Sequence, residues 1–543
     1  MNAIRRFGRL ALLILRRDRL WFAAWGLGLL ALGTFFAPMM TDIVGDETSR
    51  LVLMTTMESP MMLALCGPFY GDSFSYGALY TQFMLVWVAL AFAIMNILSI
   101  VRHTRKDEED GRSEMLAALP VGRSASLMAA FVVALGVNVL IALTTGLTIP
   151  LFAVEGMELA GSMTFACSVA VCGICFAGLT AVLAQLLSTA RGVSGVALAL
   201  CGALFLLRAI GDMGSSTGAE LLACLSPFGL IERGESFVAN HLWPVATLLL
   251  VALLLWALAF VLNAIRNHGQ GILPARSGRA HASRFLRGEL GLSWRLSRGM
   301  VIAWAVAVVV LAASYGSVLA DLGDFVESNS LYQAMLGVGA GSDDAMRPAL
   351  FAMTAFMSIT VAIPVVMVVL RLGAEEERGR MEGLLATPLA RARLILYELL
   401  IACVLACVFQ LLSALSMWAA AEASLGAGAG EAGSTSLGLA LYCKTALACL
   451  PAVLVFAALG IFLLGIAPRA RAIIWVYLAF SFLVALFGNV LSLPTWLSRL
   501  SVFDILPRYP AEAFEPMVAL ALCALCLVLF LIGTAAYRRR DLR

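Results

Sequence analysis

Two stretches of this sequence repeat one charged pattern: EEDGRSEMLAALPVGR, from Glu108 to Arg123, and EERGRMEGLLATPLAR, from Glu376 to Arg391. They align without a gap, and each follows a long apolar run. We call them the first motif and the second motif. The matching residues are Glu108, Glu109, Gly111, Arg112, Glu114, Leu116, Pro120 and Arg123 in the first, and Glu376, Glu377, Gly379, Arg380, Glu382, Leu384, Pro388 and Arg391 in the second.

The composition around the motifs is that of a membrane protein. Of 543 residues, 62% are hydrophobic and only 13% are charged, and the mean hydropathy is +0.94. A soluble domain carries roughly 25% charged residues, so this chain cannot cover itself with polar side chains. Apolar runs of about 18 residues or more recur along it, and each is long enough to cross a bilayer as a helix. The sequence therefore predicts an all-α polytopic membrane protein.

About twelve membrane spans are expected. Their approximate ranges are 20–38, 78–101, 125–150, 163–187, 191–210, 242–263, 300–322, 350–370, 395–420, 440–465, 471–491 and 517–537. With this set, about 30 of the 37 lysines and arginines fall on one side, together with both termini and both motifs. The positive-inside rule then places the termini and the motifs in the cytoplasm of a multi-pass cell-membrane protein.

The repeat predicts an internal duplication. Each motif follows the second span of a six-span set, and an even number of spans returns the chain to the same side, so the two halves are parallel. A fainter echo, Leu225–Phe228 against Leu500–Phe503, precedes the last span of each half. We expect a first half at 1–263, a basic cytoplasmic linker at 264–299 and a second half at 300–543. The arginine-rich linker lies between membrane spans, so lipid is the expected neighbour and not nucleic acid.

Each motif is predicted to form a short cytoplasmic helix. Glu108 precedes Arg112 by one helical turn, in the order that favours an ion pair of about 0.2–0.5 kcal/mol. Pro120 then ends or restarts the helix. A glycine in the same place twice, Gly111 and Gly379, suggests a kink or a close approach of another backbone. A charged cap on a membrane span would not need this repeated spacing, so we interpret the motifs as docking elements for a cytoplasmic protein.

Other polar features are expected to be structural. The arginine- and leucine-rich segment Met1–Arg19 suits a helix in the membrane interface. The two CxxC patterns, at Cys172 and Cys523, lie inside spans without metal-ligand partners, so packing is expected. Cys66 and Cys224 form a weak candidate disulfide. Interhelical hydrogen bonds are the default reading of the polar residues in spans, Asn96, Asn138 and Gln185.

The stretch VRHTRKDEEDGRSEMLAALPVGR, Val101 to Arg123, resembles the signature of bacterial ABC-2 type permeases, in particular the polyketide-antibiotic exporter group with the tetronasin-resistance permeases. The twelve-span layout fits this resemblance over nearly the whole chain. The second motif matches only in its acidic-Gly-Arg core, because Leu370 and Arg371 stand where the first half has Arg102 and His103.

The resemblance implies a type V exporter-like fold and a transport role. Glu108–Leu119 and Glu376–Thr387 would be coupling helices seated on two copies of a separate ATP-binding subunit, which would hold ATP and Mg²⁺. Met1–Arg19 would be the connecting helix, and Pro227–His241 and Leu506–Glu515 short re-entrant outer helices. Hydrophobic, antibiotic- or drug-like compounds, or lipids, would be exported. The substrate-binding residues are not specified.

The sequence holds no catalytic or metal constellation of its own. GxxxxGK[ST], which cradles phosphates, does not occur, so ATP must be hydrolysed by a partner. The four histidines are scattered without metal-ligand spacing. The alternatives are an ion-coupled twelve-span secondary transporter and a non-transporting assembly protein. The former needs ionisable residues at membrane depth, and Arg208, Glu398 and Lys444 lie near span ends, where snorkelling explains them.

Overall fold

The computed structural model describes residues 4–43, 60–71, 75–117, 120–214, 217–267, 269–273, 281, 288–328, 346–377, 379, 391–427, 437–487, 495–498 and 500–540. Within these residues every regular element is a helix. The all-α class predicted from composition is confirmed.

The chain divides into two compact units, Met1–Gly278 and Arg279–Arg543. Each unit has its own large apolar core. The division falls within the predicted linker, but the chain is helical again from Glu289, well before the predicted span at 300. We describe each unit by itself.

Unit 1 contains the N-terminal helices and the first motif. In chain order its elements are α1 (Phe7–Arg17), α2 (Arg19–Thr34), α3 (Met40–Ile43), α5 (Pro60–Cys66), α6 (Tyr76–Val101), the π-helical turn η1 (Arg102–Lys106), α7 (Asp107–Glu109), α8 (Arg112–Ala117), α9 (Ala125–Thr148), the 3₁₀ turn η2 (Ile149–Phe152), α10 (Leu159–Leu186), α11 (Ala190–Met213), α12 (Thr217–Leu225), α13 (Pro227–Glu232) and α14 (Trp243–Ile265).

Unit 2 repeats this plan with longer helices. Its elements are α15 (Glu289–Ser328), α17 (Met346–Glu377), α19 (Arg391–Ala427), α20 (Leu439–Ile466), the 3₁₀ turn η4 (Pro468–Ala470), α21 (Ile473–Phe487), α22 (Thr495–Ser498), α23 (Val502–Ile505) and α24 (Pro516–Arg539).

Eleven helices of the described residues are long and apolar enough to cross a membrane. They match the predicted spans from the second to the twelfth, mostly within a few residues at each end. The first predicted span corresponds to α2, which has 16 residues and continues as turns to Met39. At a rise of about 1.5 Å per residue, α2 spans about 24 Å, somewhat less than a bilayer core.

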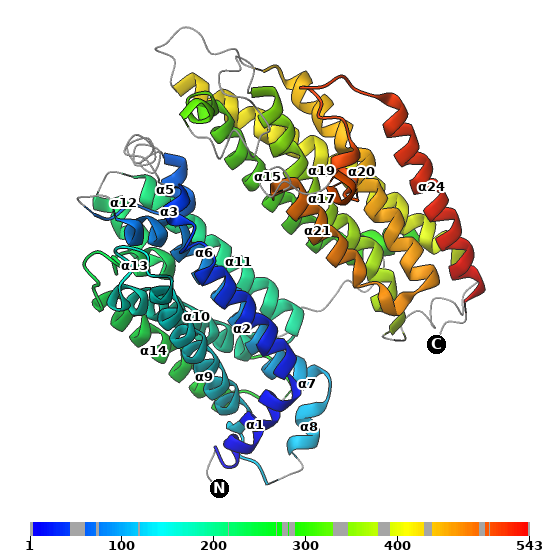
Figure 1. Cartoon of the computed structure of the whole chain (residues 1–543). Coiled ribbons are helices and arrows are strands. Elements are labelled where there is room, and N and C mark those ends of the chain that lie inside the picture. Colours follow the sequence, from blue (N-terminus) through cyan, green and yellow to red (C-terminus); the bar gives the residue numbers. More distant parts are fainter. Residues whose placement is uncertain are drawn as a thin grey trace. The chain divides into compact units, whose positions relative to one another are not determined.

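Both units place one helix at the centre of the same neighbours. In unit 1, α10 packs against α6, α9, α11 and α14; in unit 2, α20 packs against α17, α19, α21 and α24 (Figure 1). Glycines allow the closest of these contacts. A Cβ on Gly178 of α10 would stand 3.2 Å from the backbone oxygen of Ala252 in α14, and one on Gly465 of α20 would stand 2.2 Å from that of Gly533 in α24. Small residues bring membrane helices together in this way.

Two of the three polar residues considered inside the bundle of unit 1 form the expected interhelical hydrogen bonds. Asn96 of α6 and Asn138 of α9 exchange two side-chain hydrogen bonds, at 3.0 and 2.8 Å. The predicted interhelical role of these two residues is confirmed. Gln185 donates instead within its own helix, to the backbone oxygen of Ala181. All twelve cysteines are free, so the suggested disulfide between Cys66 and Cys224 is wrong.

The short segments before the last span differ between the units. Ser226 caps α13 through a hydrogen bond from the Phe228 amide. Ser501 holds the equivalent position before α23, but its side chain accepts no capping hydrogen bond. The stretch Leu506–Glu515 has no helix, so the helix implied there is wrong. Its two prolines, Pro507 and Pro510, remove amide donors that a helix would use.

Candidate functional site

The backbone of the first motif is broken at its glycine. α6 continues through η1 into α7, which ends at Glu109, and α8 begins at Arg112. Between them Gly111 has φ +71°, a left-handed conformation that favours glycine. The single helix predicted over Glu108–Leu119 is therefore wrong. Nothing in the described part of the chain lies within 4 Å of a Cβ built on Gly111, so this glycine forms the turn and not a close contact.

Glu108 is held between two arginines. Arg105 Nη1 donates to it at 2.7 Å, and the two terminal nitrogens of Arg266 donate at 2.9 and 2.5 Å. Arg105 also donates to the backbone oxygens of Ala184 and Gln270. The side chains of Arg105 and Arg266 are only 1% and 5% exposed. Because Arg266 directly follows α14, this contact fixes the motif to the end of the last span of unit 1.

The second glutamate of the motif contacts a different span. Glu109 accepts the Ala190 amide at 2.7 Å, and Ala190 is the first residue of α11. A carboxylate there satisfies one unpaired amide and suits the positive end of the helix dipole. Arg112 lies on the exposed side, where it donates to Asp107 at 3.0 Å. Glu108 thus pairs with Arg105 and Arg266, and Arg112 pairs with Asp107.

Asp18, between α1 and α2, gathers the cations that precede the motif. His103 Nε2 lies 2.9 Å from its carboxylate, Arg17 Nε lies 3.1 Å away, and Arg102 also pairs with it. Burial opposes ionisation of Asp18. The hydrogen bonds from His103, Arg102 and Arg17 outweigh it and lower the pKa of Asp18 to about 2. Arg17 also reaches Asp107, so α1 is tied to α7.

The second motif uses its two glutamates in the same way. Glu376 pairs with Arg540, which directly follows α24, and Arg540 also donates to the Leu464 backbone oxygen at 2.7 Å. Glu377 pairs with Arg471 at 2.5 Å, in the connection between α20 and α21. The first glutamate of each motif therefore contacts the end of the unit's last span. The second contacts the connection that leads into the span before it.

The remaining motif residues are distributed along connections. Arg123 donates to the backbone oxygen of Arg266, while Glu114 and Pro120 are exposed. Gly379 has φ +68°, close to that of Gly111. Some of the predicted motif residues lie outside the part of the chain that the structure describes. In the second motif these are Arg380, Glu382, Leu384, Pro388 and the side chain of Arg391, and in the first motif the side chain of Leu116.

A cavity of about 400 Å³ lies between α1 and the first motif. Leu10, Leu13 and Ile14 of α1 form an apolar wall, and Arg17 and Asp107 are among the charged residues that line it. The buried face of α1, including Leu10 and Ile14, packs against α9. The N-terminal segment thus forms an amphipathic helix, as predicted, and it borders the motif directly.

Sequence reasoning missed the partners of the motif glutamates. Arg105 and Glu108 have helical spacing, which was a usable local signal. Arg266 and Arg540 follow the last span of each half, and their equivalent places were visible once the duplication was assumed. Asp18 gave no local signal.

The snorkelling expected of Arg208 and Glu398 is wrong. Arg208 is fully buried and pairs with Glu232 at 3.2 Å and with Asp212 at 3.4 Å. Glu398 is 4% exposed and pairs with Arg371 at 2.5 Å. Lys444 is exposed. The two buried residues find their counter-charges inside their own unit, so they do not need to reach water.

The long apolar helices of both units define a polytopic, multi-pass α-helical membrane protein. A family model described as "Multidrug efflux system permease Rv1217c, C-terminal domain" matches residues 9–262 and 286–538. The multidrug efflux system permease protein Rv1217c of Mycobacterium tuberculosis (strain ATCC 25618 / H37Rv) is 33% identical over 540 residues, which cover 98% of this chain and 94% of that protein. The chain belongs to this family of multidrug efflux permeases.

Proposed function

We propose that this chain is the membrane-spanning permease of an ATP-driven exporter of the ABC-2 type, which moves hydrophobic, drug-like compounds out of the cell. Membership of the multidrug efflux permease family over nearly the whole chain is the observation that carries this proposal. ATP and Mg²⁺ would be bound by a separate subunit, since the sequence contains no P-loop. The termini and both motifs would lie in the cytoplasm.

Two ATP-binding subunits would dock on the chain, one at each motif. In the first motif the exposed surface is on α8, where the Met115 side chain is 68% exposed and that of Arg112 is 50% exposed. The glutamates behind this surface contact the spans. Movement of α8 by a docked subunit would reach α14 through Glu108 and Arg266, and α11 through Glu109.

The test changes the exposed surface of α8 and leaves the glutamate contacts intact. We expect Arg112→Ala combined with Met115→Glu to keep normal membrane abundance, because surface substitutions usually change stability by about 0.5 kcal/mol or less. Co-purification of a co-expressed ATP-binding subunit and ATP-dependent efflux should both fall. Glu155→Gln, at an exposed residue of the connection between α9 and α10, is the matched control. Wild-type co-purification and efflux by the double variant would contradict docking at α8.

The orientation is tested by cysteine labelling. A cysteine at Lys106, exposed beside the first motif, should react with an impermeant maleimide only after cell lysis. A cysteine at Glu155, at the other end of α9, should react in whole cells. The background variant would lack the native cysteines. The reverse labelling pattern would place the motifs outside the cell and exclude ATPase docking there.

A second candidate, an ion-coupled transporter, is favoured by one observation, the buried charges of Arg208, Asp212 and Glu232. Substrate uptake into inverted vesicles separates the two functions. An ATP-driven permease needs ATP and its partner, and an ion-coupled transporter responds to an imposed ion gradient without ATP.

A further inference from the structure

A cluster of buried charges lies at the end of unit 1 opposite the first motif. Arg208 and Asp212 are one turn apart on α11, and Glu232 ends α13. Arg208 Nη1 is 3.2 Å from Glu232 Oε1 and 3.4 Å from Asp212 Oδ2. Its other terminal nitrogen donates to the Ala64 backbone oxygen at 2.8 Å, so α5 belongs to the cluster as well.

The charges in this cluster do not balance. One guanidinium faces two carboxylates, and the three side chains are 0%, 2% and 4% exposed. With both acids ionised, the cluster would hold a net negative charge away from water, which is strongly unfavourable. A single positive charge added to it restores neutrality.

In the part of the chain that the structure describes, no second cation hydrogen-bonds to either carboxylate, although the nearby charge of Arg233 also favours the ionised form of Glu232. Arg233 is half-buried and donates to the Glu220 backbone oxygen, and Glu235 faces His241 at 3.9 Å. Burial raises the pKa of the Cys66 thiol to about 11 and raises that of the Tyr70 phenol, so both stay neutral near pH 7. Burial also raises the pKa of Glu232 well above its usual range, although Arg208 opposes this.

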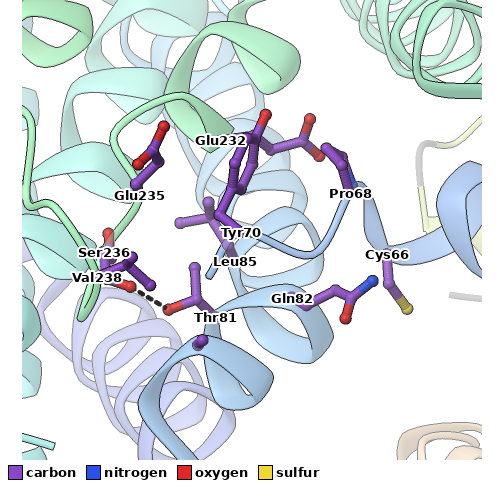
Figure 2. A pocket seen from close by; sticks show the side chains of 11 residues that line it. Cys66, Pro68, Tyr70, Thr81, Gln82, Leu85, Glu232, Glu235, Ser236 and Val238 are labelled. Atoms are coloured by element: carbon purple, nitrogen blue, oxygen red, sulfur yellow. Dashed lines mark hydrogen bonds between the residues drawn. The ribbon is translucent and has the colours of Figure 1, made fainter. Parts of the chain in front are cut away.

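A small cavity adjoins the cluster. Figure 2 shows Glu232, Tyr70 and Ser236 among the residues around it, with Thr81 hydrogen-bonded to the Ser236 backbone. Its volume of about 10 Å³ is close to the space that one water molecule needs. Glu232 Oε2 and Ser236 Oγ are buried and have no hydrogen-bond partner within the described residues. Two polar atoms that lack partners beside a water-sized space indicate a small polar occupant.

We propose that Asp212 and Glu232, facing Arg208, form a binding site for one proton, with a water molecule in the adjoining cavity. The proton comes from solvent and converts one carboxylate of the pair to a carboxylic acid, which leaves one positive and one negative charge in the cluster. No group of three or more His, Cys, Asp or Glu residues able to hold a metal occurs in the described residues. The proton joins α5, α11 and α13 in a neutral cluster, and its loss weakens their contact.

Unit 2 has no matching cluster among its described residues. The segment equivalent to α13 is α23, whose acid Asp504 is exposed. Among the described residues, the proton site therefore belongs to unit 1 alone.

The first experiment detects the proton directly. Infrared difference spectra of the purified chain in nanodiscs should show the carbonyl band of a protonated carboxylic acid at neutral pH. Glu232→Gln or Asp212→Asn should remove it, and Glu155→Gln should leave it in place. A wild-type spectrum without such a band, or a band that survives both substitutions, would overturn the proposal. The readout needs neither ATP nor a partner, so it is independent of the proposed export function.

The second experiment follows the thermal midpoint Tm against pH. The folded state keeps a proton on Glu232 that the unfolded chain releases, so Tm should fall as pH rises from near the ordinary glutamate value toward the raised one. Asp212→Asn, which leaves Arg208 and Glu232 as a one-to-one pair, should flatten this part of the curve. The titration is run in a large organic cation buffer and repeated with Na⁺. A Tm that rises with Na⁺ at fixed pH would identify a metal cation as the ligand and overturn the proton assignment.

Discussion

The two motifs have nearly the same sequence, but the structure surrounds them differently. Glu108 lies between Arg105 and Arg266, both almost fully buried. Glu376 meets Arg540, whose side chain is 19% exposed. The duplicated glutamates keep the same two destinations in each unit, and the tightness of the contact has diverged. The glutamates of the two motifs therefore connect equivalent spans, while the burial of their arginine partners differs between the units.

The divergence is larger just before the motifs, where the sequences differ. In unit 1, Arg102 and His103 pair with Asp18. In unit 2, Arg371 aligns with His103 and contacts Glu398 and the Ser293 backbone oxygen. The acid that pairs with these cations is Asp18, between α1 and α2, in unit 1, and Glu398, on α19, in unit 2. The same end of the bundle is thus held by charges from a different helix.

The largest predicted effect separates the two first glutamates. Glu108→Gln leaves two buried guanidinium groups without their carboxylate, and breaking a buried pair costs about 3–5 kcal/mol. Glu376→Gln should cost about 1 kcal/mol, because Arg540 is partly exposed and keeps its bond to the Leu464 oxygen. Thermal unfolding in detergent and membrane abundance measure both. Equal losses in the two variants would show that the units are equally dependent on this contact.

A medium effect is expected at Asp18 in acid. Its pKa is lowered from 3.8 to about 2. The stability that it contributes, about 2 kcal/mol, is therefore present above pH 4 and is lost as pH falls toward 2. Asp18→Asn should reduce stability at neutral pH and flatten the curve in this acidic window. Acid titration followed by tryptophan fluorescence measures this, with Glu155→Gln as the control. If the stability curve of the variant ran parallel to that of the wild type, Asp18 would not be the source of the acid-sensitive stability.

The smallest effect concerns the second glutamates. Glu109→Ala removes the acceptor for the first amide of α11 and should cost about 1 kcal/mol. Glu377→Ala breaks a pair with Arg471 in which the Glu377 side chain is 64% exposed, so the cost should be about 0.5 kcal/mol or less. The same unfolding assay compares them. A larger loss for Glu377 would reverse the order of the two units at this position.

Sequence alone predicted the features that depend on local composition. The positions of the long helices, the amphipathic α1 and the interhelical hydrogen bonding of Asn96 and Asn138 follow from apolar run length, periodicity and the need of a buried amide for a partner. At Gly111 the sequence leaves two options open, because a glycine serves equally for a kink and for a close contact. The spans predicted from apolar run length lie near their helices, and α2, with 16 residues, is the predicted span that lies outside the eleven candidate membrane helices.

The unpredicted part depends on contacts between distant residues. Glu108 and Arg266, or Arg208 and Glu232, meet only because helices far apart in sequence pack side by side. A charged residue near the end of a span is ordinarily explained by snorkelling to the membrane surface. The sequence does not reveal that a residue of opposite charge lies beside it within the bundle. Docking at the motifs remains a prediction, and most of the second motif lies outside the described residues.

The left-handed turns of the two motifs constrain mutation at the level of the codon. Every single-base missense change of a glycine codon introduces a residue with a Cβ. At Gly111 and Gly379 nothing in the described chain would touch that Cβ, so the cost is the backbone penalty alone, about 1–2 kcal/mol for most residues. Aspartate tolerates this conformation better than alanine or valine, and one base change reaches it from a codon ending in a pyrimidine. Where the glycine codon ends in a pyrimidine, aspartate is therefore the single-base replacement expected to be tolerated best at either turn.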